Sequence, residues 1–114
     1  MTFLSNMKKE YRVKESDEFQ KIMRGRRFHN SKSYSLYIEE RKEDHARFGI
    51  SVPKKLGNAV LRNKSKRQVR SMLQHLAPYD GKYDVIIIVR KGYFSKSYDD
   101  NEKDLEKLMK TVKM

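Results

Sequence analysis

The chain has 114 residues, of which 27 are basic and 15 are acidic, so its formal net charge at pH 7 is +12. That length fits one domain with one hydrophobic core. Because the sequence contains no cysteine, disulfide scaffolds, zinc ribbons, iron–sulfur clusters and thiol nucleophiles are excluded.

The distribution of apolar residues indicates a cytoplasmic protein without a membrane partner. The longest apolar run covers residues 85–89, whereas a membrane-spanning helix needs about 20 residues. Residues 1–7 contain no apolar core of signal-peptide length. We expect a single domain over residues 1–114, with a flexible segment at residues 1–10.

The N-terminal half predicts a short helix followed by two strands. Ser16 suits the N-cap of a helix and Gly25 suits its end. Residues 33–41 and 47–52 alternate between apolar and polar side chains, as half-buried strands do. The charged residues between them, 41–44, predict the tip of a hairpin.

The C-terminal half predicts a long helix, a buried strand and a last helix. The long helix begins at Asn58 and runs to about Leu76. Residues 83–89 are nearly all apolar, as expected of a strand buried on both faces. Apolar side chains recur at helical spacing over about residues 100–112. The expected class is therefore α+β, in the order α-β-β-α-β-α, with room for an extra short strand near Phe28.

The positive charge is concentrated in one segment. Between His45 and Tyr79 there is no acidic residue, although the segment holds eight lysines and arginines. The other 79 residues carry 19 basic and 15 acidic side chains, a net charge of only +4. Such focusing is typical of proteins that bind a polyanion, because each neutralised phosphate releases counterions. The alternative is a basic surface that only maintains solubility.

Much of this charge falls on one face of the long helix. At about 100° per residue, five polar positions share an arc of roughly 140°: Arg62, Asn63, Lys66, Arg67 and Arg70. A neighbouring arc predicts the core face and holds Leu61, Val69, Met72, Leu73 and Leu76. Lys64 lies well outside the basic arc. An ordinary solvated face would mix the two signs of charge, and a membrane-surface helix would take its apolar stripe away from a small core.

At these residues the sequence becomes recognisable. Residues 47–67 read Arg-Phe-Gly-Ile-Ser-Val-Pro-Lys-Lys-Leu-Gly-Asn-Ala-Val-Leu-Arg-Asn-Lys-Ser-Lys-Arg, which closely resembles the signature of the bacterial ribonuclease P protein subunit. The resemblance extends from about Tyr11 to about Met109. Two positions depart from the family: Lys64 replaces the second arginine of its Arg-Asn-Arg triplet, and Met23 stands where the family often has an aromatic residue.

The resemblance implies a fold, a function and partners. The fold would be the family's α+β sandwich, a mixed sheet packed by helices with a left-handed β-α-β crossover. The protein would assist a catalytic RNA in the endonucleolytic removal of the 5′ leader from precursor tRNA. Its partners would be ribonuclease P RNA and precursor tRNA, with no small-molecule substrate and with Mg²⁺ held mainly by the RNA subunit. The resemblance predicts contacts to that subunit from Lys54, Lys55, Asn58, Arg62, Asn63, Lys64, Lys66, Arg67 and Arg70.

The sequence also offers an aromatic surface for single-stranded RNA. Tyr37 points to the polar side of its strand, away from Tyr34, Leu36 and Ile38. Single-stranded RNA is typically held by aromatic side chains that stack on bases, with cations beside them. The alternatives are core packing for Phe19 and a half-buried tyrosine with a solvated hydroxyl for Tyr37. With the resemblance, the predicted leader-binding residues are Phe19, Met23, Lys32, Tyr37, Ser51 on the neighbouring strand, and Arg90.

We expect no catalytic or metal-binding residues in the protein itself. The three histidines, His29, His45 and His75, fall in separate elements. The acids at positions 99, 100, 102 and 104 lack the glycine and terminal glutamate of a calcium loop, and acids are favoured at a helix start anyway. A structural RNA-binding protein such as a ribosomal component is the main alternative, followed by a protein nuclease and a DNA-binding module.

Overall fold

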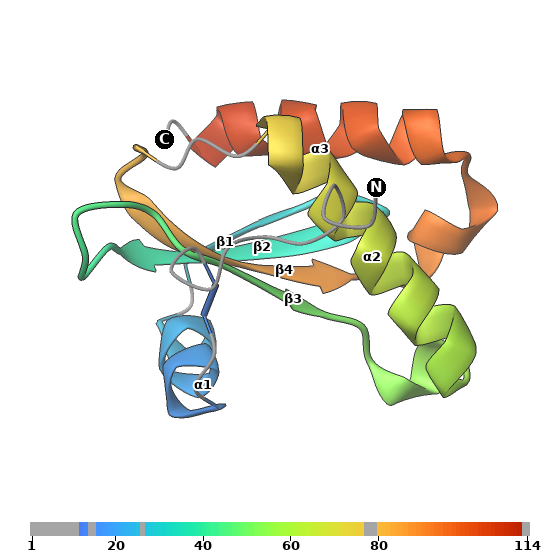
Figure 1. Ribbon diagram of the computed structural model, residues 1–114, viewed down its shortest axis with the longest axis horizontal. Coiled ribbons are helices and arrows are strands. Elements are labelled where there is room, and N and C mark those ends of the chain that lie inside the picture. The colour runs from blue at the N-terminus through green and yellow to red at the C-terminus, as the bar shows by residue number, and fades with distance from the viewer. Residues whose placement is uncertain (1–11, 14–15, 26, 77–79, 113–114) are drawn as a thin grey trace.

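The computed structural model describes residues 12–13, 16–25, 27–76 and 80–112 (Figure 1). The predicted flexible segment, residues 1–10, lies outside this part of the chain. The elements follow in the order α1 (Ser16–Arg24), β1 (Phe28–Asn30), β2 (Tyr34–Glu40), β3 (Phe48–Ser51), α2 (Ala59–Leu76), β4 (Tyr83–Val89) and α3 (Tyr98–Val112). Two short 3-10 helices, η3 (Lys54–Leu56) and η4 (Lys91–Ser95), follow β3 and β4. The α+β class and the extra strand near Phe28 are thus confirmed.

Side-chain caps set the starts of the two long helices. The Asn58 side-chain oxygen accepts a hydrogen bond from the backbone N–H of Leu61, 2.9 Å away, at the start of α2. The Ser97 hydroxyl oxygen accepts one from the N–H of Asp100, 3.1 Å away. This second cap explains why α3 begins at Tyr98, two residues before the predicted start.

The four strands form one mixed sheet in the order β1-β2-β4-β3. Strand β4 is antiparallel to β2 and parallel to β3. The predicted hairpin at residues 41–44 is therefore wrong, because β4 lies between β2 and β3. The apolar strand β4 takes a central position, where both its faces are covered, and the two amphipathic strands flank it.

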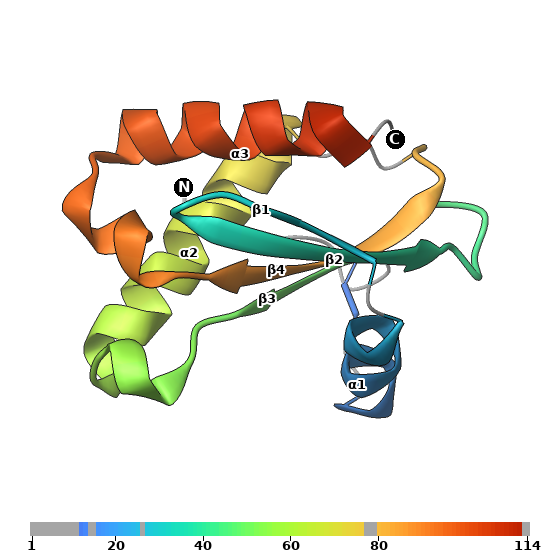
Figure 2. The same cartoon turned by 180° about the vertical axis from the view of Figure 1, so that it is seen from behind.

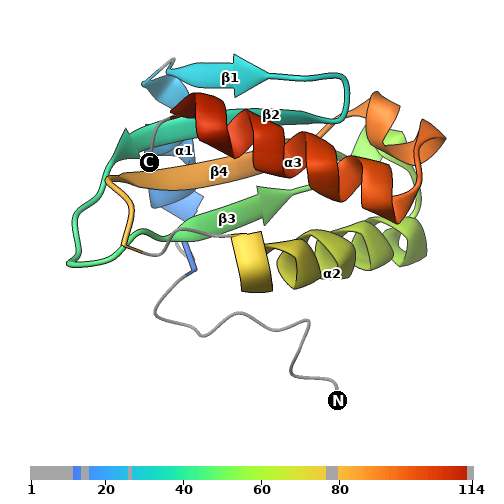
Figure 3. The same cartoon turned by 90° about the horizontal axis from the view of Figure 1, so that it is seen from above.

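The connection from β3 through α2 to β4 is left-handed, as the resemblance implied. In Figure 3, β3 runs to the right, α2 returns to the left beyond the β3 edge, and β4 runs to the right again, one place nearer β2. Helix α2 packs on the side of the sheet that faces the viewer, as α3 does. Connections of this kind are right-handed in nearly all proteins. The rare hand places α2 on the same face of the sheet as α3.

The sheet separates two apolar clusters of unequal size. Helices α2 and α3 cover one face and α1 lies against the other (Figures 1 and 2). The main core under α2 and α3 includes Tyr34, Leu36 and Ile38 of β2, as their alternation predicted. The smaller cluster beneath α1 is centred on Ile22 and Ile86. The α1 face of the sheet therefore has less apolar cover than the opposite face.

One residue of the predicted core face of α2 is not in the core. Leu61 is 37% exposed, because the first turn of α2 extends past the end of the sheet. Val69, Met72 and Leu73, further along the helix, are fully buried. No helix in the described ranges is long and apolar enough to cross a membrane.

Candidate RNA interface

Helix α2 carries cations that lack acidic partners. Arg62, Lys66 and Arg70 follow one another at intervals of four residues and are half-buried. Asn63, Lys64 and Arg67 are exposed, as are Lys54 and Lys55 on η3. Among the described residues, none of these cations has a carboxylate within 4 Å. These cations of α2 and η3 form a basic strip, which is therefore available for an external anion.

Asn58 has a second role besides the one predicted for it. Its side-chain oxygen caps α2, so this atom is already committed to the protein. Its side-chain N–H groups remain as donors for a bound RNA. The structure thus gives this residue a structural task that its place in the family signature did not indicate.

Arg12 joins the basic strip, although sequence reasoning missed it. Its backbone forms a β-bridge with Phe48, which brings it to the edge of the sheet. Burial, together with the nearby charge of Arg12, lowers the pKa of Arg70. The Nε atoms of Arg12 and Arg62 are also buried without a hydrogen-bond partner in the described part of the chain. Arg12 and Arg70 thus bring two guanidinium groups together without an acid, and this favours a phosphate as their missing partner. Arg12 is 58 residues from Arg70 in the chain, so no local pattern could have linked them.

Arg47 does not belong to the free basic surface, although it lies in the acid-free segment. Its Nη2 lies 3.0 Å from an Asp84 carboxylate oxygen and also contacts Glu18. The side chain is only 11% exposed. The hydrogen bond from Arg47 lowers the pKa of Glu18. Two acids distant in sequence thus neutralise this arginine, and seven of the eight cations in the segment are left for a partner.

The α1 face of the sheet carries an aromatic pair. Tyr37 of β2 lies opposite Phe28 of β1, and their ring centroids are 5.5 Å apart. Phe28 is 50% exposed and Tyr37 is half-buried. Tyr37 therefore points away from the main core, as its alternation predicted. Sequence reasoning missed Phe28, because β1 has only three residues and its register with β2 was not predicted.

Phe19 and Met23 of α1 pack beside this pair. Both are partly buried against the small cluster around Ile22 and Ile86. A Cβ atom on Gly49 would lie 2.6 Å from Phe19 Cζ, so this glycine gives the ring room to approach the strand. Phe19 is thus both a packing residue and a wall of the aromatic face.

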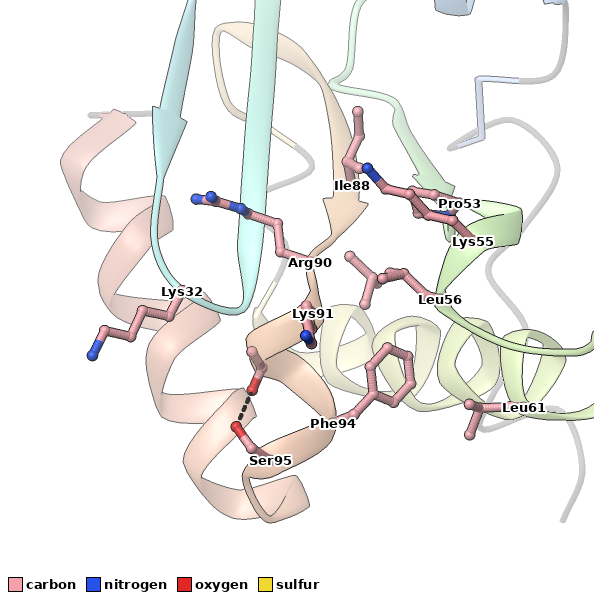
Figure 4. Close-up of a pocket in the computed structure, with 12 residues that line it drawn as sticks. Lys32, Pro53, Lys55, Leu56, Leu61, Ile88, Arg90, Lys91, Phe94 and Ser95 are labelled. Carbon is pink, nitrogen blue, oxygen red and sulfur yellow. Dashed lines mark hydrogen bonds between the residues drawn. The ribbon is translucent and has the colours of Figure 1, made fainter.

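Ser51 lies on a strand that is not next to that of Tyr37, and Lys32 and Arg90 lie at the end of the sheet. Ser51 shares the face of Tyr37, but β4 separates their strands, so it is not on a neighbouring strand. Arg90 follows the end of β4, four residues beyond Ile86, the partner of Tyr37. This spacing corresponds to about 13 Å along a strand. Lys32 and Arg90 line a hollow of about 1120 Å³ at the end of the sheet (Figure 4).

The histidines, and Asp104 among the clustered acids, contact other side chains of the protein. Each histidine makes a separate contact: His29 with Thr111, His45 with Asp44, and His75 with Glu102. Asp104 accepts a hydrogen bond from Ser31 and pairs with Lys96. Within the described ranges, no group of three or more histidine, aspartate and glutamate side chains could hold a metal ion.

Comparisons with known proteins agree with this architecture. The sequence model of a family described as Ribonuclease P matches residues 7–113. The ribonuclease P protein component of Mesoplasma florum is 42% identical, with 90% of this chain and 96% of that protein covered. The component from Streptococcus agalactiae is 46% identical, with coverages of 91% and 95%. A solved structure of the Staphylococcus aureus RNase P protein superposes with a TM-score of 0.82 at 36% identity, covering 90% of this chain and 95% of that one.

Proposed function

This chain belongs to the ribonuclease P protein family, and from that premise we propose how its two surfaces act in tRNA processing. The basic strip of α2 and η3 binds the RNA subunit of the ribonucleoprotein. The aromatic α1 face binds the single-stranded 5′ leader of precursor tRNA. The observation that supports this division most directly is that the sheet separates the acid-free cations of α2 from the Phe28–Tyr37 pair on the α1 face.

The cationic strip suits a folded RNA because its charges are closely spaced and lack acidic partners. Arginine can bind a phosphate through two parallel hydrogen bonds, and Arg62, Arg67 and Arg70 lie within three turns of α2. Each phosphate contact releases counterions, which makes the binding strong at low salt. Phosphate contacts carry no sequence information, so RNA shape and charge would determine the preference of these cations.

The aromatic face suits a single strand because unpaired bases expose their flat surfaces. Phe28 and Tyr37 together form a platform wider than one ring, tilted by 37°. Stacking of a base on such a platform contributes about 1–3 kcal/mol and depends little on sequence. A leader of any sequence could therefore be held, as a processing enzyme with many substrates requires.

The protein would position RNA and leave the cleavage to its partner. Mg²⁺ is expected at the cleavage site, but the described residues offer no cluster of ligands that fits it. We therefore assign the ion mainly to the RNA subunit and derive no step through it. The chain's own contribution is to hold the leader and to offset phosphate repulsion between two RNAs, in the bacterial cytoplasm.

Reconstitution tests this proposal. End-labelled precursor tRNA is incubated with Mg²⁺ and the purified protein, the RNA subunit, or both. We expect the leader to be removed at the mature 5′ end only in mixtures that contain the RNA subunit, and we expect the protein to strengthen substrate binding there. Cleavage at that position by RNA-free protein would show that the chain has an active site of its own.

A further inference from the structure

A two-residue segment at the β3 edge of the sheet connects the two faces of the molecule. Arg12 forms a parallel β-bridge with Phe48 of β3, and the backbone N–H of Val13 donates to the Phe48 carbonyl oxygen, 3.0 Å away. We call residues 12–13 the edge segment. Two residues, 14 and 15, separate it from the start of α1 in the chain. A contact that holds the edge segment in place therefore also affects the position of α1.

The two side chains of the edge segment point to opposite faces of the sheet. Residues paired across a bridge place their side chains on the same face, so Arg12 shares the side of Phe48, which belongs to the core under α2 and α3. Val13 points to the other side, because successive residues of a strand alternate. It is 5% exposed and belongs to the small cluster beneath α1. One side chain thus faces the basic strip and the other supports α1.

On the α2 side, Arg12 approaches Arg70 without an acid to neutralise either charge. Helix α2 packs against β3, the strand that holds the edge segment. Burial and the charge of Arg12 lower the pKa of Arg70, which shows that the contact is unfavourable in the free protein. Among the described residues, neither arginine has a carboxylate within 4 Å, and Arg12 Nε is buried without a hydrogen-bond partner. Two guanidinium groups placed in this way suit one phosphate between them.

On the α1 side, Val13 carries a large share of the support for the helix. The buried members of the small cluster are Val13, Ile22 of α1 and Ile86 of β4. Phe19 of α1 packs against the same cluster. If the edge segment left the sheet, α1 would lose one of these buried neighbours, and the ring of Phe19 would lose part of its base. The geometry of the α1 face therefore depends on whether Val13 stays in place.

We propose that Arg12 and Arg70 bind one phosphate of the RNA subunit between them, and that this contact fastens the edge segment so that Val13 holds α1 in position for the leader. Binding of the RNA subunit on one face thereby strengthens binding of the leader on the other. The inference rests on the proposed function, because it couples the two surfaces assigned there. Such a coupling is reciprocal, so a bound leader strengthens the assembly of protein and RNA subunit by the same factor.

The first measurement tests whether the two arginines share a phosphate. Arg12→Met, Arg70→Met and the double variant keep unbranched side chains without the charge. Their affinities for the RNA subunit, without tRNA, are measured over a range of salt concentrations. Each single variant should bind about tenfold more weakly, and its slope of log affinity against log salt should fall by about 0.7–0.9. The double variant should be little worse than either single variant, because all three lose the same contact.

Two results of this measurement would overturn the shared site. Additive losses in the double variant, with a slope that falls twice, would mean that the two arginines bind separate phosphates. Unchanged assembly in Arg12→Met, together with weaker binding of mature tRNA to the holoenzyme, would mean that the phosphate comes from the tRNA and not from the RNA subunit.

The second measurement tests the coupling across the sheet. At concentrations that saturate assembly, the affinity of the holoenzyme for precursor tRNA divided by its affinity for mature tRNA gives the contribution of the leader. Arg12→Met should lower this ratio by about 5-fold or more, and Val13→Ala should lower it without weakening assembly. The matched control is Arg67→Met, which removes one exposed cation from α2. It should weaken assembly and keep the parent's ratio, because Arg67 is not part of the edge segment.

The outcomes separate this inference from the proposed function. If Arg12→Met weakens assembly but keeps the parent's ratio, the coupling is wrong and the two surfaces act independently, which the proposed function allows. If Arg67→Met lowers the ratio as much as Arg12→Met does, weaker assembly alone explains the effect and the inference fails. If the parent binds precursor and mature tRNA equally well, the proposed leader surface is itself wrong.

Unfolding of the free protein distinguishes a phosphate-binding arginine from a packing residue. Without RNA, Arg12 and Arg70 repel each other, so Arg12→Met should be at least as stable as the parent in urea unfolding. Val13→Ala should be less stable, because it removes methyl groups from the small cluster. A clear loss of stability in Arg12→Met would show that Arg12 holds the edge segment without any anion, which contradicts the proposal.

Discussion

Arg47 lies inside the basic signature, but its charge is used within the fold. Its guanidinium group joins Glu18 of α1 to Asp84 of β4, and its backbone N–H donates to Asp84 Oδ1 over 2.9 Å. Asp84 is 1% exposed, so removal of the arginine would leave a buried carboxylate without its charge partner. The bridge holds α1, and with it Phe19, against the sheet.

Acid should weaken this bridge. The pKa of Glu18 is lowered in the folded protein, mainly by the hydrogen bond from Arg47. The stabilisation is therefore present above the ordinary glutamate pKa of about 4.3 and is lost as the pH falls through the folded value. In urea unfolding, Glu18→Gln should lower stability by about 1 kcal/mol at pH 7 and should reduce the further loss of stability below pH of about 4.5.

The matched control for this experiment is Glu106→Gln on the exposed side of α3, where the structure shows no partner for the carboxylate among the described residues. That variant should retain the parent's stability and its acid dependence. If Glu18→Gln retains them as well, the bridge to Arg47 contributes nothing to the attachment of α1.

At the scale of the element, α2 combines a buried stripe with a strip of cations, and its length allows both. Eighteen residues give five turns, so Val69, Met72 and Leu73 can enter the core while the first turn extends past the sheet. The neighbouring η3 adds Lys54 and Lys55 to the same surface. If this surface binds phosphates, removing cations from it should change both the affinity for RNA and its salt dependence.

A charge-matched pair of triple variants tests the location of the binding charge. Arg62, Lys66 and Arg67 are replaced by alanine in one protein, and Lys103, Lys107 and Lys110 of α3 in the other. Both changes remove three positive charges. The α2 variant should bind the RNA subunit more weakly, and the slope of log affinity against log salt should fall by up to about 0.7–0.9 for each phosphate that the variant no longer neutralises.

The α3 variant should keep a slope close to that of the parent, because its lysines lie on a different helix. Equal changes in both variants would mean that net charge, and not the α2 strip, determines RNA binding. Thermal unfolding serves as the control for Arg62, whose Nε atom is buried and whose loss could disturb the first half of α2.

At the scale of the whole molecule, the sheet separates the two surfaces that we propose bind RNA. Helix α1 and the aromatic pair lie on one face, and α2 lies with α3 on the other (Figure 2). The turn that contains η3 connects them at the β3 edge, and the hollow lined by Lys55 and Phe94 opens beside it. Under the proposed function, one small domain would thus contact a large RNA and its substrate strand together.

Local signals in the sequence predicted the elements but not how they pair. The period of apolar residues located α1, α2, β4 and α3, because these patterns depend on residues close in the chain. The central place of β4, the Arg47 bridge and the approach of Arg12 to Arg70 depend on residues brought together only by the fold. Phe28 was missed for the same reason, since it acquires its neighbour from strand register.

The central claim is that the α1 face binds the leader and α2 binds the RNA subunit, and one comparison tests it directly. The affinity of the holoenzyme for precursor tRNA with a leader of several nucleotides, and for mature tRNA without one, is measured with the parent and with Tyr37→Ala. The variant should bind the precursor more weakly by about 1–3 kcal/mol and mature tRNA equally well, while Tyr37→Phe, which keeps the ring, behaves as the parent. Equal losses for the two tRNAs would contradict the account, because Tyr37 would then be a packing residue and the leader would lie elsewhere.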